Sequence, residues 1–248
     1  MRTVQAVAWK EIQVYFSSPT AYIVALIFLI GTGVFFTVEL GTPFPEASLS
    51  NFFVGIDVGI FTFGGVTLIL ILLAPALTMR LLAEEQKMGT IELLLTSPVR
   101  DWEIILGKYL ASLVFLLATL SLTLYYPILL FLYANPDPGP IYSGYLGLVL
   151  YGAAALSIGI LTSTLTSNQI VAFVVAAGIL LVLYFTEFAS LVVGQGVWAT
   201  VIGEMGIKSH FDDFNRGVID TKHIVYFLSV IAIFLFLSIR ALESRRWR

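Results

Sequence analysis

The sequence contains no cysteine and little charge of either sign. Without cysteine, the chain forms neither disulfides nor thiolate-ligated metal or redox sites. Charged residues make up 12% of the sequence, roughly half of the share in an ordinary soluble domain. No basic stripe of the kind that binds a phosphate backbone is present, so we expect no nucleic acid partner.

Apolar residues take the place of the missing charge. They make up 58% of the chain, and the mean hydropathy is +0.95. A soluble fold with this composition lacks the polar residues needed to cover its surface. Six uncharged runs approach the ~20 residues that a helix needs to cross a bilayer. The sequence therefore predicts an all-α membrane protein, a single domain over 1–248, with transmembrane helices at 19–38, 58–79, 109–133, 145–166, 170–193 and 224–239.

Basic residues separate the connecting segments into two sets. Ten lie on the N-terminal segment, the loop 80–108 and the C-terminal tail, whereas the other connections together hold three, Lys208, Arg216 and Lys222. Lys and Arg are enriched on the cytoplasmic side of membrane proteins. We therefore expect both termini and the loop 80–108 in the cytoplasm.

Small residues recur at four-residue spacing inside the spans, for example Ala155 and Gly159. This spacing allows helix backbones to approach closely. We expect ordinary packing within the chain, and a dedicated dimer face is the alternative.

The N-terminal stretch 3–17 is amphipathic. Its apolar arc includes Ile12 and Tyr15, Lys10 lies opposite, and Glu11 interrupts the arc. Trp9 and Tyr15 suit the headgroup level, so the pattern predicts a helix along the inner membrane surface. The alternative is a solvated lead-in to the first span.

The loop 80–108 contains two helical signals. Arg80 and Glu84 are spaced for an i,i+4 ion pair, which predicts that the second span continues into the cytoplasm as far as Met88. Gly89 ends that extension.

A second, short helix follows Gly89. Thr90 is its expected N-cap, Glu92 favours its positive end and Pro98 bounds it. It displays four large apolar side chains in a cytoplasmic region, and these require cover. Either the membrane and the protein's own helices provide it, or a groove on a partner protein does. The four are Ile91, Leu93, Leu94 and Leu95.

Three segments carry a family resemblance. They are W-K-E-I with the later S-S-P-T-A-Y-I, the central A-E-E-Q-K-M-G-T-I-E-L-L-L-T-S-P-V, and the late S-H-F-D-D-F-N-R-G-V-I-D. The chain resembles the ABC-2 type transporter permeases, and is similar to the gliding-motility type and to permeases associated with copper-site maturation of nitrous oxide reductase. The resemblance implies a type V exporter-like permease domain in a prokaryotic inner membrane.

The resemblance also implies a division of labour. The helix 90–96 corresponds to the coupling helix that docks on a separate ATPase subunit, and 3–17 corresponds to the elbow helix. Glu84 and Glu85 would lie beside the ATPase, with solvated surface charge as the alternative. The external segment 194–222 corresponds to short re-entrant helices.

The chain has no G-x-x-x-x-G-K-[ST] phosphate loop. We therefore expect no enzyme activity and no cofactor in this chain, with ATP and Mg bound by the ATPase partner. One coupling helix per chain implies a second permease copy or a paralogue, besides membrane lipids.

The predicted function is the permease subunit of an exporter. The alternative is a subunit that relays ATPase motion to periplasmic proteins without moving a substrate. We also considered a metal site at His210, Asp212, Asp213 and His223, but their spacing is not diagnostic, and polar loop composition is the preferred explanation.

Overall fold

Helices make up almost all of the structure. The computed structural model describes residues 2–41, 48–58, 61–91, 99–194 and 196–246. Within these ranges, six helical segments are long and apolar enough to cross a membrane. The predicted all-α fold with six spans is confirmed. A short antiparallel hairpin, β1 (Ile56–Val58) with β2 (Phe61–Phe63), is an addition to that fold.

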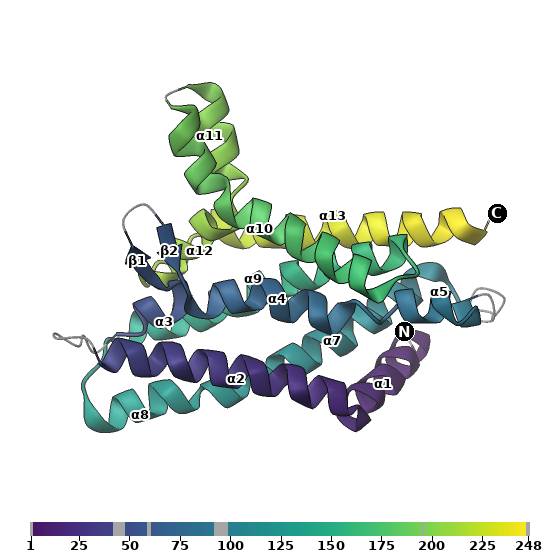
Figure 1. Ribbon diagram of the computed structural model, residues 1–248, viewed down its shortest axis with the longest axis horizontal. Helices are drawn as coiled ribbons and strands as arrows, with labels where there is room; N and C mark the ends of the chain where they lie inside the picture. Colours follow the sequence, from purple (N-terminus) through teal and green to yellow (C-terminus); the bar gives the residue numbers. More distant parts are fainter. Residues whose placement is uncertain (1, 42–47, 59–60, 92–98, 195, 247–248) are drawn as a thin grey trace.

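The spans run antiparallel between two distinct ends (Figure 1). Both termini lie at one end, together with the short helix α5, and we call this the terminal end. The hairpin, α3, α11 and α12 lie at the opposite end. The helices are α1 (Arg2–Ser17), α2 (Pro19–Leu40), α3 (Ser50–Val54), α4 (Gly65–Thr78), α5 (Ala83–Lys87), α7 (Asp101–Thr123), α8 (Tyr125–Tyr133), α9 (Pro138–Leu165), α10 (Gln169–Val193), α11 (Val197–Glu204), α12 (Ile207–Asn215) and α13 (Thr221–Arg246).

The second span begins later than the sequence predicts. α4 starts at Gly65 rather than near Val58, because Val58 and Phe61–Phe63 belong to the strands of the hairpin. Gly64 and Gly65 both have positive φ angles, of 92° and 77°, which glycine adopts far more readily than other residues. Apolar composition alone could not distinguish the hairpin from the helix.

The third span is divided at Leu124 into α7 and α8. Pro127 lacks the N–H that would bond to the carbonyl of Thr123. The Tyr145 hydroxyl donates to that carbonyl instead, at 2.9 Å. The kink that Pro127 predicts is therefore stabilised from α9.

α9 is the central helix of the bundle. In the most apolar 18-residue stretch of α9, 78% of the residues are buried, compared with 17% in the corresponding stretch of α13. At four of its glycines, a different neighbouring element packs closely against α9. A Cβ at any of these positions would come within 3.0 Å of a side chain of that element. Gly144 faces Phe53 of α3, Gly147 faces Phe214 of α12, Gly152 faces Leu116 of α7, and Gly159 faces Thr78 of α4.

Candidate functional site

Helix α1 packs along α7 at the terminal end. Its apolar arc faces the protein: Ala8 and Tyr15 are buried, and a Cβ on Gly107 of α7 would lie 2.7 Å from Val7. The predicted amphipathic helix is therefore covered by α7 on its apolar face. Trp9 is 64% exposed, as a side chain at the headgroup level would be.

Tyr15 takes a different place from the one that the sequence suggested. Its ring is buried and stacks on Phe115, with the centroids 5.2 Å apart. Its hydroxyl donates to the Leu77 carbonyl at 2.8 Å, and the Arg80 guanidinium lies 5.4 Å from the ring centroid. Tyr15 thus joins α1 to α4 instead of facing the headgroups.

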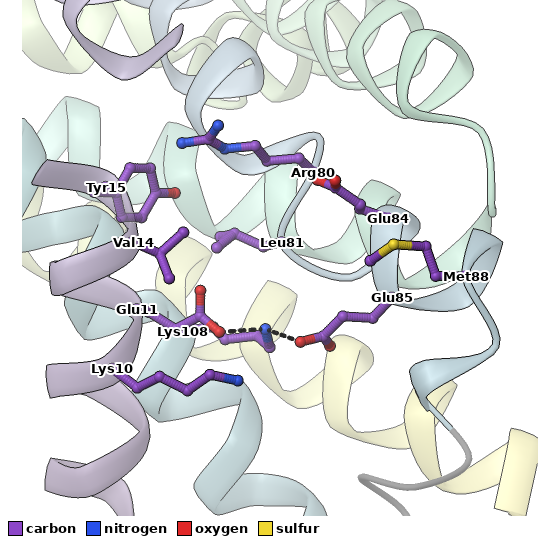
Figure 2. A pocket seen from close by; sticks show the side chains of 10 residues that line it. All are labelled: Lys10, Glu11, Val14, Tyr15, Arg80, Leu81, Glu84, Glu85, Met88 and Lys108. Carbon is purple, nitrogen blue, oxygen red and sulfur yellow. Dashed lines mark hydrogen bonds and ion pairs between the residues drawn. The ribbon is translucent and has the colours of Figure 1, made fainter. Parts of the chain in front are cut away.

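Three charged side chains meet between α1, α5 and α7, and we call them the Lys108 triad. The Lys108 ammonium lies 2.8 Å from an oxygen of Glu11 and 2.8 Å from an oxygen of Glu85, as Figure 2 shows. The side chains of Lys108 and Glu11 are 2% and 11% exposed, and that of Glu85 is 20% exposed. Two carboxylates therefore share one buried ammonium, and each comes from a different helix.

The expected ion pair between Arg80 and Glu84 does not form. Residues 79–82 form a turn between α4 and α5, although the Glu84 N–H still donates to the Arg80 carbonyl, at 3.3 Å. Arg80 donates instead to the hydroxyls of Ser18 and Thr20, at the start of α2.

Ser163 of α9 bonds the interrupted backbone. Its hydroxyl accepts from the N–H groups of Leu82 and Ala83, both at 3.1 Å, and donates to the Met79 carbonyl at 3.1 Å. The Gln86 amide donates to the Thr164 carbonyl at 2.9 Å. The backbone groups that the break would leave unpaired are thus satisfied from α9.

A pocket of about 280 Å³ lies above the triad, between α1 and α5. Glu84 and Met88 border it on the α5 side, and Lys10 borders it on the α1 side (Figure 2). Its lining combines acidic, basic and apolar side chains, and the apolar ones include Val14 and Leu81. Such a surface can receive a charged side chain of a partner, but it holds no nucleophile paired with a base.

The segment after α5 is described only in part. Gly89 has a φ of +70° and follows the end of α5, and the Thr90 hydroxyl donates to the Glu85 carbonyl at 3.3 Å. Ile91 is buried within the chain. The remaining residues of the expected coupling helix, Glu92, Leu93, Leu94, Leu95 and Pro98, lie outside the described residues.

Comparison with known families identifies the family of this chain. The family model ABC2_membrane, described as ABC-2 type transporter, matches residues 2–190. The chain belongs to the ABC-2 type transporter family. The Lys108 triad and α5 of this ABC-2 chain lie within the matched residues, whereas α11, α12 and α13 lie beyond them.

Two curated relatives resemble part of this ABC-2 chain. The probable multidrug ABC transporter permease YbhR of Escherichia coli strain K12 is 29% identical over 137 residues, which is 55% of this chain and 37% of that protein. YbhR of Escherichia coli O157:H7 has the same identity and coverage. The match thus spans little more than a third of the length of these relatives.

Local sequence pattern does not pair the residues that hold this ABC-2 chain together at its terminal end. Glu11 was read as a flaw in an apolar arc, yet its position on that arc is what aims it at Lys108. Ser163 and Gln86 gave no signal, because their bonds join residues about 80 positions apart. A buried lysine at the start of a span is the clue that a search for ion pairs could have used.

Proposed function

We propose that the chain is the permease subunit of an ATP-driven exporter and couples to a separate ATPase subunit at its terminal end. That end faces the cytoplasm of a prokaryotic inner membrane. The observation that carries the proposal is the concentration of Lys and Arg there, on α1, on residues 80–108 and on the end of α13, in a chain of the ABC-2 family.

The contacts of α5 support a coupling role. Glu85 pairs with Lys108 of α7, and through it with Glu11 of α1. Gln86 bonds to α9. A displacement of α5 by an ATPase would therefore reach three elements at once, and packed elements of this kind move as discrete units.

A second permease copy completes the proposed exporter, because one chain offers one coupling segment. The apolar segments of α4 and α9 contain no Asp, Glu, Lys, Arg or His. Ionised substrates would need such groups as partners in the membrane. We therefore propose an apolar or amphipathic substrate, and ATP-dependent accumulation of such a compound in proteoliposomes would distinguish export from the relay of motion to periplasmic proteins.

The double substitution Leu93→Asp/Leu94→Asp tests the ATPase interface. Apolar anchors at the centre of an interface contribute about 2–4 kcal/mol each, so we expect affinity for the ATPase subunit to fall at least about 30-fold. Co-purification in mild detergent, with quantitative mass spectrometry of the ATPase, measures the loss.

The control is Val218→Asp/Ile219→Asp, which changes two adjacent exposed apolar residues at the opposite end. It should leave association intact. Equal recovery of the ATPase by both double variants would refute the coupling assignment.

Single cysteines test the orientation, because the chain has none of its own. Met88 is 62% exposed at the terminal end, and Val218 is 52% exposed at the other. In intact cells, a membrane-impermeant maleimide should label Val218→Cys, and should label Met88→Cys only after permeabilisation. The reverse pattern would invert the proposed topology.

A further inference from the structure

The two histidines of the chain contact each other at the end opposite the termini. His210 of α12 and His223 of α13 are 3% and 6% exposed, and their Nδ1 atoms lie 2.7 Å apart. His210 Nε2 lies 3.0 Å from the Glu204 carbonyl oxygen. His223 Nε2 lies 2.6 Å from an Asp213 carboxylate oxygen. We call the two rings the histidine dyad.

The number of protons on the dyad follows from these contacts. The Glu204 carbonyl can only accept, so His210 Nε2 must donate to it and carry a proton. The Asp213 carboxylate likewise accepts, which requires a proton on His223 Nε2. The contact between the Nδ1 atoms needs one proton between them. Three protons on four ring nitrogens are one more than two neutral imidazoles carry.

A metal ion does not fit between the rings. Zinc bound to two histidines at about 2.0–2.1 Å holds their nitrogens roughly 3.3 Å apart in tetrahedral geometry. The observed 2.7 Å is shorter and matches a hydrogen bond. The separation therefore fits a shared proton.

We propose that the histidine dyad is a proton-binding site that holds exactly one excess proton and thereby clamps α12 onto α13. With the proton lost, two lone pairs would face each other at the Nδ1 atoms. With a second proton gained, two N–H groups would face each other. The hydrogen bond between the rings, and with it the clamp, therefore forms only when the dyad holds one excess proton.

Few charged groups face the dyad. Lys222 of α13 forms an ion pair with Glu204 of α11 at 2.8 Å, so these two charges largely cancel near the rings. Tyr226 of α13 stacks on His210 at 3.8 Å and donates its hydroxyl to the Met205 carbonyl. α3 and α9, which also pack on α12, contain no Asp, Glu, Lys, Arg or His, and the buried Tyr151 of α9 packs on Phe211 of α12 and Phe227 of α13. α10 contributes Glu187, whose side chain lies outside the described residues. Asp213 is therefore the carboxylate that contacts the dyad directly.

The surroundings of His210 disfavour a positive charge on this ring. Burial lowers the pKa of His210, the Glu204 carbonyl partly offsets this, and the neighbouring His223 lowers it further. His210 therefore resists the uptake of a second excess proton by the dyad. Acid must overcome the lowered pKa of His210 before it opens the clamp.

Imidazole nitrogen NMR tests the proposal on the full chain in lipid nanodiscs. Because the chain has two histidines, ¹⁵N-histidine labelling gives one signal set for each ring. We expect two titration steps separated by more than about one pH unit, as strongly coupled sites show. Between the steps, a scalar coupling across the Nδ1–H···Nδ1 bond should be visible. Two rings that titrate independently, without that coupling, would overturn the proposal.

Variants separate the shared proton from general electrostatics. In His210→Gln, His223 should titrate in one step, and the amides of 207–215 should exchange faster at neutral pH. Asp213→Asn should lower the midpoint at which the excess proton is lost. Asp212→Asn removes the same charge one residue away and should shift that midpoint by less. Equal shifts in the two variants would show that net charge, and not the contact with His223, holds the proton.

Discussion

Replacing Lys108 by methionine is expected to lower the free energy of unfolding by about 3–5 kcal/mol, because it leaves the buried carboxylates of Glu11 and Glu85 without their shared cation. The methionine preserves most of the apolar stem, so the loss reports charge rather than volume. Equilibrium unfolding in mixed micelles measures it. The same variant should weaken the attachment of α1, visible as faster amide exchange in residues 4–15.

Two further variants show whether the loss in Lys108→Met comes from charge pairing or from packing. Lys222→Met breaks the exposed ion pair with Glu204 and should have no measurable effect on unfolding, because exposed pairs are well solvated. A triple variant with methionine at Glu11, Glu85 and Lys108 should recover most of the loss, since apolar replacements of a buried ion cluster are commonly neutral. If the triple variant is as unstable as Lys108→Met, packing of the lysine and not charge pairing is responsible.

Gly159→Leu is expected to destabilise the bundle by about 1–3 kcal/mol or more through overpacking. A Cβ at Gly159 would lie 2.0 Å from the Thr78 hydroxyl oxygen and 3.1 Å from the Thr78 Cβ. Thr78 cannot withdraw easily, since its hydroxyl is bonded to the Ala74 carbonyl at 2.9 Å. α4 and α9 would have to separate, and α5 with them. Unfolding and export assays measure the two consequences.

Gly178→Leu is the matched control for Gly159→Leu. Gly178 lies in the middle of α10, and a Cβ there would meet nothing within 4 Å. The variant should insert and unfold like the parent protein. A comparable loss in both variants would attribute the effect to leucine in a span rather than to the contact between α4 and α9.

Composition and local pattern predicted a large part of the fold. Runs without charge identified the six spans, and Gly89 predicted the end of α5, which stops at Lys87. Each of these signals lies within a few residues of the feature that it predicts. The hairpin before α4 was missed because its apolar residues continue the composition of the span.

Local sequence pattern could not predict the contacts of the candidate site. Lys108 pairs with Glu11 across 97 positions, and the Ser163 hydroxyl reaches Leu82 across 81. The distance to a partner along the chain carries no periodic signal, so one sequence cannot select among the available carboxylates. The second span extends to Lys87, close to the predicted Met88, but a turn at 79–82 interrupts it. Helix propensity does not foresee this turn, whose backbone groups bond to Ser163.

Under the proposed coupling to an ATPase, the bonds of Ser163 make α9 the first helix that a displacement of α5 would reach. Residues 79–82 form a turn between α4 and α5, so α5 does not continue α4 as one uninterrupted helix. α9 is joined to α5 by the side chains of Ser163 and Gln86, and it contacts α3, α4, α7 and α12 at its glycines. α9 also packs extensively on α10 and α13, so a displacement of α9 would reach most of the bundle at once. In the proposed transport cycle, the buried helix at the centre of the protein would therefore move before its more exposed outer helices.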